Sequence, residues 1–388
     1  MTWGAFEIVL FIVLILSFVA QLLFYWMVLA KPYQYMQSIV QYQASQPPVS
    51  IIISLQDSKY DLFQFLPDIL DQDYPEFEVV VITDGISDAD EEALIRMKNK
   101  YPNLYSTHVP ESTRNVSRKK LALTLGIKAA KYDRLLFTES DCRIRTKDWI
   151  SSMARHFSDK KTIVLGFSAL ENAKNLPRKF IAYDYLFSNL QMISLALFDH
   201  PYMGNGRNMA YSKEHFIEQK GFVKHRTLQQ GEDDLFINEI ATGENTAVEL
   251  SPQSVTFVEI DDYYDWKRQK VSRMSTKQFY KFGPVAFWRS ETYIRICFFA
   301  AFFACIINGF PYSSLSAFLL PEIALAFFIA RFFSQFIVLN KTLEYLQLEK
   351  FYMTIPLFDL FQPFINLYFF IYRIFKEKEN YTYHYEKR

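Results

Sequence analysis

The sequence predicts an α/β fold, in which a mostly parallel sheet domain is flanked by N- and C-terminal transmembrane helices. Short β-branched runs recur in the middle of the chain at intervals of about 30 residues or fewer, as is typical of βαβ units. Long apolar segments lie near both ends. We therefore expect an N-terminal anchor (1–32), a cytoplasmic α/β domain (33–291), a C-terminal membrane region (292–375) and a basic, polar tail (376–388).

Composition excludes several classes of protein. The 42 Lys and Arg residues balance 42 Asp and Glu residues, so the chain lacks the basic excess of a nucleic-acid-binding protein. Half of the residues are hydrophobic, which excludes a disordered chain. The 3 cysteines form no CxxC pair and the 6 histidines show no metal-binding spacing, so neither a disulfide scaffold nor a zinc site is expected.

The N-terminal apolar segment runs from Ile8 to Leu29 and contains only two polar residues, Ser17 and Gln21. It is long enough to cross a bilayer. The first basic residue, Lys31, follows it, so the positive-inside rule predicts that the Lys31 side is cytoplasmic. A buried helix of a globular domain is the alternative, and the length and uniform apolarity of the segment favour the membrane.

The C-terminal region contains three apolar segments, Tyr293–Phe310, Leu315–Leu339 and Phe351–Phe375. The last contains two prolines and an aspartate, which predicts a broken segment. Three crossings here would leave the tail outside, although its basic residues favour the cytoplasm. We expect two spans followed by a re-entrant or interfacial segment, and a fourth crossing is the alternative. The basic residues are Arg373, Lys376, Lys378, Lys387 and Arg388.

The middle domain alternates predicted strands and helices. Apolar β-branched runs predict the strands, and helical spacing of apolar residues predicts the helices. Acidic residues in the first turn support a helix that begins at Ser87. The predicted strands are Val49–Ser54, Glu78–Thr83, Leu104–Val109 and Arg134–Thr138, and the other predicted helices are Leu62–Gln72 and Lys119–Lys131.

Carboxylates follow three of these strands: Asp57, Asp84, and the pair Glu139 and Asp141 on either side of Ser140. An Asp in this position can be an ordinary turn residue. Ligands of parallel sheets, however, bind beyond the carboxyl ends of the strands. Clustered carboxylates also need a cation or hydrogen-bond donors. The Glu139–Asp141 turn could hold a divalent ion together with a diphosphate, and an exposed acidic turn is the alternative.

A second acidic cluster, Glu232-Asp233-Asp234, follows Gly231 and precedes a predicted helix. Adjacent acids raise one another's pKa values, which would suit a general base working near neutral pH. Capping of the helix by one of the acids is the structural interpretation, and both can hold together.

Together these motifs resemble the membrane-bound, family 2 type of inverting glycosyltransferases with the GT-A (Rossmann-like) fold. The resemblance covers about residues 49–282. It rests on VSIIISLQD, FEVVVITDG, RKKLALTLGIKAAKYDRLLFTESDC, which ends in a DxD-like motif, and GEDDLF, in that order.

The resemblance implies a role for each motif residue. Leu55, Asp57 and Asp84 would line the pocket for the base and ribose, and Lys119 or Lys120 would lie near the phosphates. Asp141 and Glu139 would hold Mg²⁺ or Mn²⁺, with Glu139 and Ser140 near the ribose and diphosphate. Asp233 would be the general base, with Glu232 and Asp234 beside it. The loop Pro201–Asn208 (PYMGNGRN) resembles the one near the sugar and acceptor, and an ordinary turn is the alternative.

Three departures from the family pattern matter. The first DxD acid is Glu139, and Asp57-Ser58 replaces the usual Asn-Glu. The QxxRW motif of processive synthases is imperfect, because Ser-Arg stands where Arg-Trp is usual. Gln269, Lys270 and Arg273 could still contact the diphosphate, and a solvated basic helix is the alternative.

We therefore expect a metal-dependent inverting hexosyltransferase on the cytoplasmic face of a membrane, most consistent with the bacterial inner membrane. It would move a sugar from a UDP- or GDP-sugar to a lipid-linked or other membrane-delivered acceptor, such as a cell envelope glycan, with the lipid bilayer but no nucleic acid as a partner. A processive polysaccharide synthase and a non-catalytic glycosyltransferase-like scaffold are the alternatives.

Overall fold

The computed structural model describes residues 4–38, 46–56, 62–110, 117–171, 174–226, 228–260, 263–308 and 315–376. The chain divides into two compact units. Residues 1–38 and 282–367 form the helical unit, and residues 39–281 and 368–388 form the sheet unit.

The sheet unit is built on a seven-stranded sheet with the order β3-β2-β1-β4-β8-β6-β9. Strands β1 to β4 are parallel neighbours, which confirms the predicted α/β class with a mostly parallel sheet. Strand β8 is antiparallel to both β4 and β6. The strands are β1 (Val49–Gln56), β2 (Phe77–Asp84), β3 (Leu104–His108), β4 (Arg134–Glu139), β6 (Ile163–Leu165), β8 (Met209–Ser212) and β9 (Thr246–Val248).

A second sheet has three short strands in the order β5-β10-β7. They are β5 (Cys142–Ile144), β7 (Ser168–Leu170) and β10 (Thr256–Val258). Because β5 begins three residues after β4 ends, the turn Glu139–Asp141 is held between two strands that belong to different sheets.

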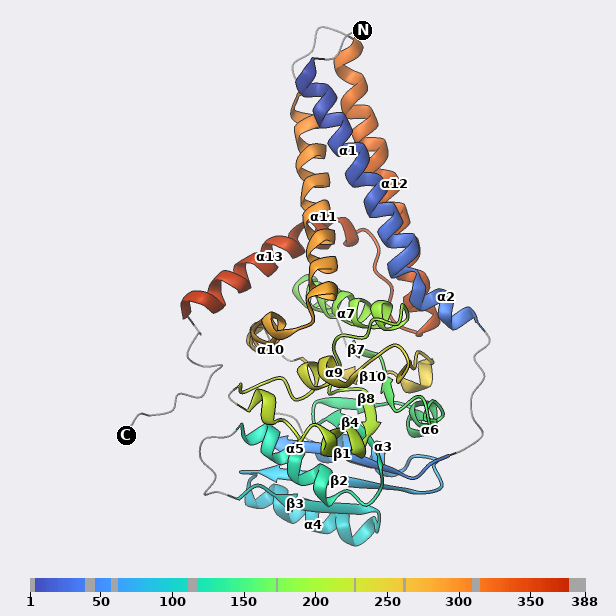
Figure 1. Cartoon of the computed structure of the whole chain (residues 1–388), viewed down its shortest axis with the longest axis vertical. Helices are drawn as coiled ribbons and strands as arrows, with labels where there is room; N and C mark the ends of the chain where they lie inside the picture. Colours follow the sequence, from blue (N-terminus) through green and yellow to red (C-terminus); the bar gives the residue numbers. More distant parts are fainter. Residues whose placement is uncertain are drawn as a thin grey trace. The chain divides into compact units, whose positions relative to one another are not determined.

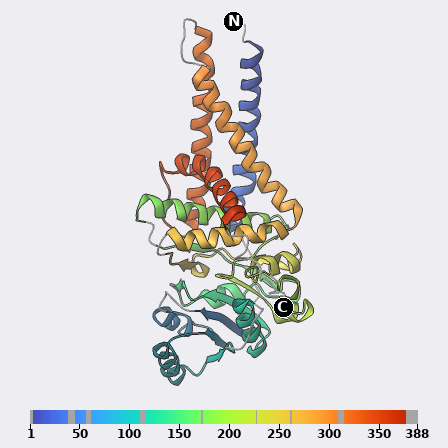
Figure 2. The ribbon, with the colours of Figure 1, turned by 90° about the vertical axis from the view of Figure 1, so that its left-hand side faces the viewer.

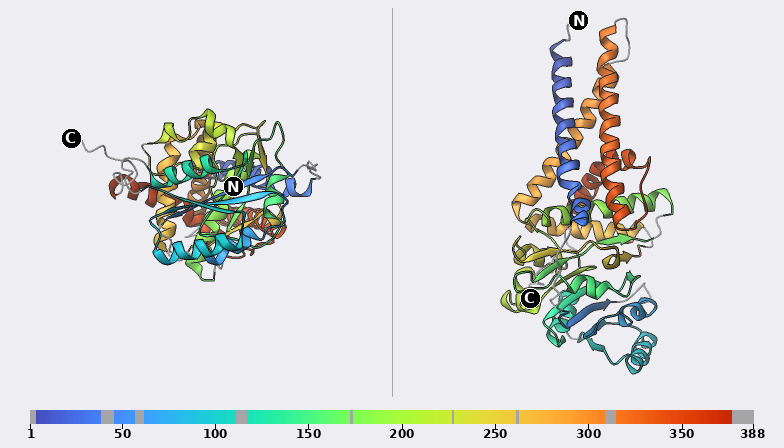
Figure 3. Two further views of the ribbon diagram at one scale, coloured as in Figure 1. Left: turned by 90° about the horizontal axis from the view of Figure 1, so that it is seen from below. Right: turned by 90° about the vertical axis from the view of Figure 1, so that its right-hand side faces the viewer.

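Helices cover both faces of the large sheet (Figure 2, Figure 3). Those of the sheet unit are α3 (Leu62–Leu70), α4 (Asp88–Lys100), α5 (Arg118–Ala129), α6 (Trp149–Ala154), α7 (Leu176–Ala196), α8 (Lys213–Glu218), α9 (Asp234–Ile240) and α10 (Tyr263–Thr276), with short 3₁₀ turns η2 (Val223–His225), η3 (Pro252–Ser254) and η4 (Lys277–Phe279). The helix predicted to begin at Ser87 is α4; Ser87 is its N-cap, and the Ser87 hydroxyl accepts a hydrogen bond from Asp90 N.

The strands are apolar on both faces because both faces are covered. Ile51 and Ile53 are fully buried in a core that they share with residues of α3, α4 and α6. Ile52 and Ile82 point to the opposite face, where Gly126 of α5 approaches so closely that a Cβ there would lie 2.3 Å from Ile82 Cδ1. Full burial of each such side chain is worth about 1.5–3 kcal/mol, so the two apolar layers hold the carboxyl edge of the sheet in place.

The helical unit contains α1 (Ala5–Leu23), a π-helical turn η1 (Phe24–Leu29), α2 (Lys31–Gln37), α11 (Phe282–Asn308), α12 (Leu315–Tyr345) and the first part of α13 (Ile355–Lys376). Helices α1, α11 and α12 pack side by side (Figure 1). Among the described residues, four helical segments are long and apolar enough to cross a membrane: Ala5–Gln37, Phe282–Ile307, Leu319–Tyr345 and Ile355–Phe375.

Helix α13 differs from the broken segment that its prolines predict. It runs without interruption from Ile355 to Lys376, with Pro363 inside it. Pro356 lies in the first turn, where a missing N–H leaves no intrahelical hydrogen bond unmade. The choice between a re-entrant segment and a fourth crossing stays a prediction.

Four charged residues of the helical unit, Glu291, Arg295, Arg331 and Asp359, are buried and paired with one another. Arg295 Nη2 lies 2.9 Å from Glu291 Oε2, and its Nη1 lies 3.1 Å from Asp359 Oδ1. Arg331 Nη2 lies 2.6 Å from Asp359 Oδ2. Charged side chains in membrane segments face protein and pair with one another. Asp359 therefore ties α13 to both α11 and α12.

Candidate functional site

A cleft of about 510 Å³ opens in the sheet unit beyond the carboxyl ends of β1 and β4. Its size is that of a site for a small molecule or cofactor. The cleft collects most of the residues that the sequence singled out, from β4, α5, the start of α9 and α10. The predicted residues that line it are Lys119, Glu139, Ser140, Asp141, Glu232, Asp233, Asp234, Gln269 and Arg273.

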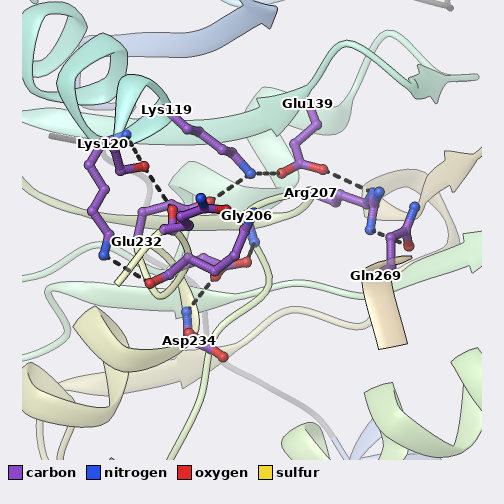
Figure 4. Close-up of polar contacts among 12 residues, drawn as sticks. Lys119, Lys120, Glu139, Gly206, Arg207, Glu232, Asp234 and Gln269 are labelled. Atoms are coloured by element: carbon purple, nitrogen blue, oxygen red, sulfur yellow. Dashed lines mark hydrogen bonds and ion pairs between the residues drawn. The ribbon is translucent and has the colours of Figure 1, made fainter. Parts of the chain in front are cut away.

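The two carboxylates of the DxD-like turn share one guanidinium. Arg207 Nη2 lies 2.6 Å from Asp141 Oδ2, and its Nε donates to Asp141 Oδ1 at 3.2 Å. The same Nε lies 3.2 Å from Glu139 Oε2 (Figure 4). Gln269 of α10 accepts a hydrogen bond from Arg207 Nη1 at 3.3 Å. The bidentate contact with Asp141 is the strong form of an Arg–carboxylate pair.

Lys119 joins the two acidic motifs. Its Nζ lies 2.6 Å from Glu139 Oε1 and 2.7 Å from Glu232 Oε1 (Figure 4). Burial would raise the pKa of Glu139, but the positive charges of Lys119 and Arg207 outweigh burial and lower that pKa to about 2. Glu139 is therefore ionised throughout the neutral pH range.

Asp233 is both a helix cap and a cleft residue. It is the N-cap of α9, and its Oδ1 accepts a hydrogen bond from Asp234 N at 2.7 Å. Its Oδ2 accepts another from Gly206 N, in the loop 201–208, at 2.9 Å. A Cβ at position 206 would lie 3.3 Å from that oxygen, so glycine permits the close approach. The capping interpretation is thus confirmed, and the cap also orients the carboxylate at the cleft.

Asp234, at the start of α9, has a raised pKa. Its Oδ2 accepts hydrogen bonds from Thr276 Oγ1 and Tyr280 Oη, each at 2.5 Å. Burial, and then the charge of Asp233, raise the pKa of Asp234 to about 7, although both hydroxyl donors act in the opposite direction. The hydrogen bonds from Thr276 and Tyr280 also link Asp234, at the start of α9, to the end of α10 and the residues that follow it.

Four of the predicted binding residues that the structure describes, Leu55, Asp84, Lys120 and Lys270, do not line this cleft. Lys270 Nζ lies 2.5 Å from Asp184 Oδ1 instead. Leu55 is fully buried in the core, so its side chain does not reach the cleft. Asp84 does not line the cleft; it accepts hydrogen bonds from Arg118 Nε at 2.8 and 2.9 Å. The ammonium group of Lys120 donates hydrogen bonds to backbone carbonyl oxygens. Asp57 lies outside the described residues.

Sequence reasoning did not single out several residues of the cleft, among them Arg207 and Ser54. Arg207 lies within the loop PYMGNGRN, and a lone cation in that glycine-containing loop was the available signal. Ser54 lies beside Glu139 in the sheet register and lines both the cleft and a small cavity of about 20 Å³. Among the described residues, Ser54 Oγ, Thr138 Oγ1 and Glu232 Oε2 line this cavity as buried polar atoms without a hydrogen-bond partner. The cavity has room for one water molecule that could satisfy them.

The donor set fits a divalent cation only in part. Within the described residues, no three or more His, Cys, Asp or Glu side chains gather as a ready metal site. Glu139 and Asp141 supply two carboxylates, which suit Mg²⁺ or Mn²⁺ when substrate phosphates complete the coordination. Arg207 already contacts both carboxylates, so an ion would have to share them with it or displace it.

The model of glycosyl transferase family 21 matches residues 9–378, which is nearly the whole chain. The protein belongs to glycosyl transferase family 21. The match establishes a nucleotide-sugar-dependent glycosyltransferase, and it does not specifically show the expected resemblance to family 2. Its four long apolar helices indicate an integral membrane protein. No match is found among proteins with curated descriptions.

Three solved structures are similar to this family 21 member, and one of them, PcManGT, supports its fold. The mannosyltransferase PcManGT from Pyrobaculum calidifontis, in complex with GDP-Man and Mn²⁺, has 16% identity and a TM-score of 0.53, over 96% of this chain and 99% of its own. TarS 1–349 of S. aureus, in complex with UDP-GlcNAc, has 17% identity and a TM-score of 0.40, over 76% and 89%. GalNAc-T7 with UDP, GalNAc and Mn²⁺ has 13% identity and a TM-score of 0.42, over 56% and 45%. At such identities PcManGT supports the GT-A fold alone.

Proposed function

We propose that this glycosyltransferase inverts the anomeric centre of a hexose as it moves the sugar from a UDP- or GDP-sugar to a hydroxyl of a lipid-linked or membrane-delivered acceptor. The observation that carries the proposal is the single cleft that brings Asp233 together with Glu139 and Asp141. Lys119 pairs with both Glu139 and Glu232 and so bridges the two acidic motifs. The general base and the residues that hold the diphosphate would therefore face one bound donor.

The chemistry follows from these groups. Asp233, oriented by two backbone N–H donors, takes the proton of the acceptor hydroxyl. The hydroxyl oxygen forms a bond to the anomeric carbon as the bond from that carbon to the diphosphate oxygen breaks. The nucleoside diphosphate leaves with the bonding electron pair. Among the cations that line the cleft, Lys119, Arg207 and Arg273 stabilise this negative charge.

We propose Mg²⁺ or Mn²⁺ as the cofactor, held by Glu139 and Asp141 with the phosphates of the donor. When bound, the ion would supply further neutralisation of the leaving diphosphate. The structure of PcManGT, which holds GDP-Man and Mn²⁺, supports this choice. Since Arg207 contacts both carboxylates, we propose that it turns toward the phosphates when the ion binds.

The membrane segments support a location for the acceptor. Lys31 directly follows the first apolar segment, so we propose that the sheet unit lies in the cytoplasm, at the bacterial inner membrane. An enzyme anchored in the bilayer meets acceptors that are delivered by the membrane. We propose addition of one sugar in each binding event, because the QxxRW motif of processive synthases is incomplete in α10.

Donor binding and turnover test the proposal in the detergent-solubilised full chain. UDP- and GDP-sugars are added with and without Mn²⁺, and the shift in melting temperature is measured. A donor at a hundredfold excess over its Kd should stabilise the protein by about 2.7 kcal/mol. The absence of any shift and of any sugar transfer or hydrolysis would support the scaffold alternative instead. Products longer than one added sugar would support a processive synthase.

Substitution then tests the base. Asp233→Asn should lower kcat by roughly 10²–10⁴, because the amide cannot take the proton of the acceptor hydroxyl. The asparagine keeps only one of the two hydrogen bonds from Gly206 N and Asp234 N, so donor binding is measured for this variant as well. Asp159→Asn is the matched control, since Asp159 is exposed and outside the cleft. Turnover of Asp233→Asn near that of the unmodified enzyme would remove Asp233 from the mechanism.

A further inference from the structure

Lys120 is a buried cation beneath the segment that leads into the acidic motif of residues 231–234. Its residue is 2% exposed. Its Nζ donates hydrogen bonds to the carbonyl oxygens of His225 at 2.6 Å, Leu228 at 2.8 Å and Gln230 at 2.8 Å. An ammonium group has three N–H donors, so all of them are used on this segment.

A second side chain at the start of α5 also contacts this segment. Ser117, the N-cap of α5, donates from its Oγ to the carbonyl oxygen of Gln229 at 2.7 Å. Residues 229–233 belong to no helix or strand, so their backbone lacks the regular hydrogen bonds of secondary structure. The contacts with Lys120 and Ser117 satisfy backbone carbonyls of the segment instead. Gly231 follows with a φ of 106°, a conformation that favours glycine. The position of the motif therefore depends on α5.

Lys119 and Lys120 have separate tasks because they are neighbours on a helix. Successive helical residues point about 100° apart. Lys119 lines the cleft and reaches its carboxylates, whereas Lys120 does not line the cleft and donates to backbone carbonyls, including that of Gln230. The sequence Arg-Lys-Lys offers either lysine for the phosphates, and the geometry assigns the cleft to Lys119 alone.

We propose that Lys120 is a positioning residue whose charged ammonium group holds the segment 228–230 and thereby sets the place of Glu232 and Asp233 in the cleft. The inference rests on the proposed function of Asp233 as the base. Lys120 touches neither donor nor acceptor in this arrangement; it acts through the backbone of the motif.

The charged groups around Lys120 allow a test by pH. Burial lowers the pKa of Lys120, the charges of Glu232, Asp234 and Asp233 oppose burial, and the result is a pKa of about 8. His225 also faces Lys120, but its pKa is itself lowered by burial, and its ring lies 3.0 Å from Glu239 of α9. His225 is thus uncharged where Lys120 titrates. Above about pH 8 the neutral amine keeps two N–H donors and loses one hydrogen bond.

Activity and stability should then respond to pH in opposite directions. The folded pKa of about 8 lies below the unfolded value of about 10.4. Between these values the unfolded chain binds more protons, so the contribution of Lys120 to the free energy of unfolding rises with pH. The hold on the segment weakens over the same range. A decline of kcat above pH 8 without a decline of melting temperature is the expected signature of positioning.

The experiment compares Lys120→Met, Lys120→Arg and a control in the full-length protein. Lys128→Met is the matched control, because Lys128 is exposed on the same helix. Lys120→Met should lower kcat by about 10²-fold, the cost of a misplacement of about 1 Å. The KM for the donor should change far less. Lys120→Arg keeps its charge at every accessible pH and should abolish the decline above pH 8.

Hydrogen–deuterium exchange supplies a readout without donor or acceptor. Loss of the charged hydrogen bonds in Lys120→Met should speed exchange of residues 228–234 by at least about tenfold and leave β1 and β2 unchanged. Unchanged exchange there, or an alkaline decline that persists in Lys120→Arg, overturns the inference. Should Lys120→Met not fold, exchange of the unmodified protein below and above pH 8, corrected for intrinsic rates, decides it. Absence of transfer by the unmodified protein would count against the proposed function alone.

Discussion

Arg207 allows a prediction whose magnitude follows from its contacts. The residue is 6% exposed, and its guanidinium contacts both Glu139 and Asp141. Removal of one partner of a buried ion pair costs about 3–5 kcal/mol, because the other charge stays buried and unpaired. In Arg207→Met, Lys119 still neutralises Glu139, so the loss falls mainly on Asp141 and should lie near the lower end, about 3 kcal/mol.

A differential melting assay of the detergent-solubilised chain measures this loss. One kcal/mol moves the melting temperature of a domain of this size by about 2–4 °C, so Arg207→Met should melt about 6–12 °C lower. Mn²⁺ should restore much of the lost melting temperature. A hundredfold excess of the ion over its Kd stabilises the protein by about 2.7 kcal/mol, and in the variant no guanidinium contacts Glu139 or Asp141. The melting temperature of the unmodified protein should rise less with Mn²⁺, since the guanidinium of Arg207 competes with the ion for the two carboxylates.

Arg155→Met is the control for this assay. Arg155 Nη2 lies 2.7 Å from the buried Glu249 Oε2, outside the cleft. Its loss should lower the melting temperature without any new response to Mn²⁺. The reasoning is refuted if Arg207→Met melts with the unmodified protein, or if Mn²⁺ shifts both by the same amount.

Three further predictions follow from the described contacts. Asp141→Ala should weaken Mn²⁺-dependent donor binding at least about tenfold by calorimetry, and an unchanged affinity would exclude its metal role. Burial raises the folded pKa of Asp234 to about 7, above the unfolded value of about 3.9, so its contribution to stability is full below about pH 4 and lost as pH rises through 7. In denaturant titrations, Asp234→Asn should flatten that decline by about 2–4 kcal/mol, and an equal slope in both proteins would contradict it. Asp359→Asn should destabilise the helical unit by about 3–5 kcal/mol because two arginines lose a buried partner, whereas Glu322→Gln, at an exposed site, should not.

The strands were predictable because their signals are local. Runs such as VSIIIS and EVVVIT combine β-branched residues with burial on both faces, which is what a central parallel strand requires. The observed strands β1 and β2 extend the predictions by only a residue or two at their ends. Strand β8 was not predicted, because its four residues carry little local signal and pair with β4 and β6, which lie far away in the chain.

The sequence allowed the presence of the acidic motifs to be predicted, but not the arrangement of their side chains. Acid residues after buried strands and before a helix can be read from the order of the chain, and the structure gathers Glu139, Asp141 and Asp233 at one cleft. Which acid acquires the raised pKa could not be read. Asp234 has it because Tyr280 and Thr276 enclose it, and both lie more than forty residues further along the chain.

By itself, the order of amino acids determined the apolar membrane segments, the parallel strands and the carboxylates that end them, because each depends on neighbours within a few residues. Packing alone decided that Arg207 meets Asp141, 66 positions away, and that Lys119 faces the cleft while Lys120 holds the approaching backbone. The physical reason is range: a charge interacts with whatever lies a few ångströms away, and only the folded chain brings distant segments within that distance.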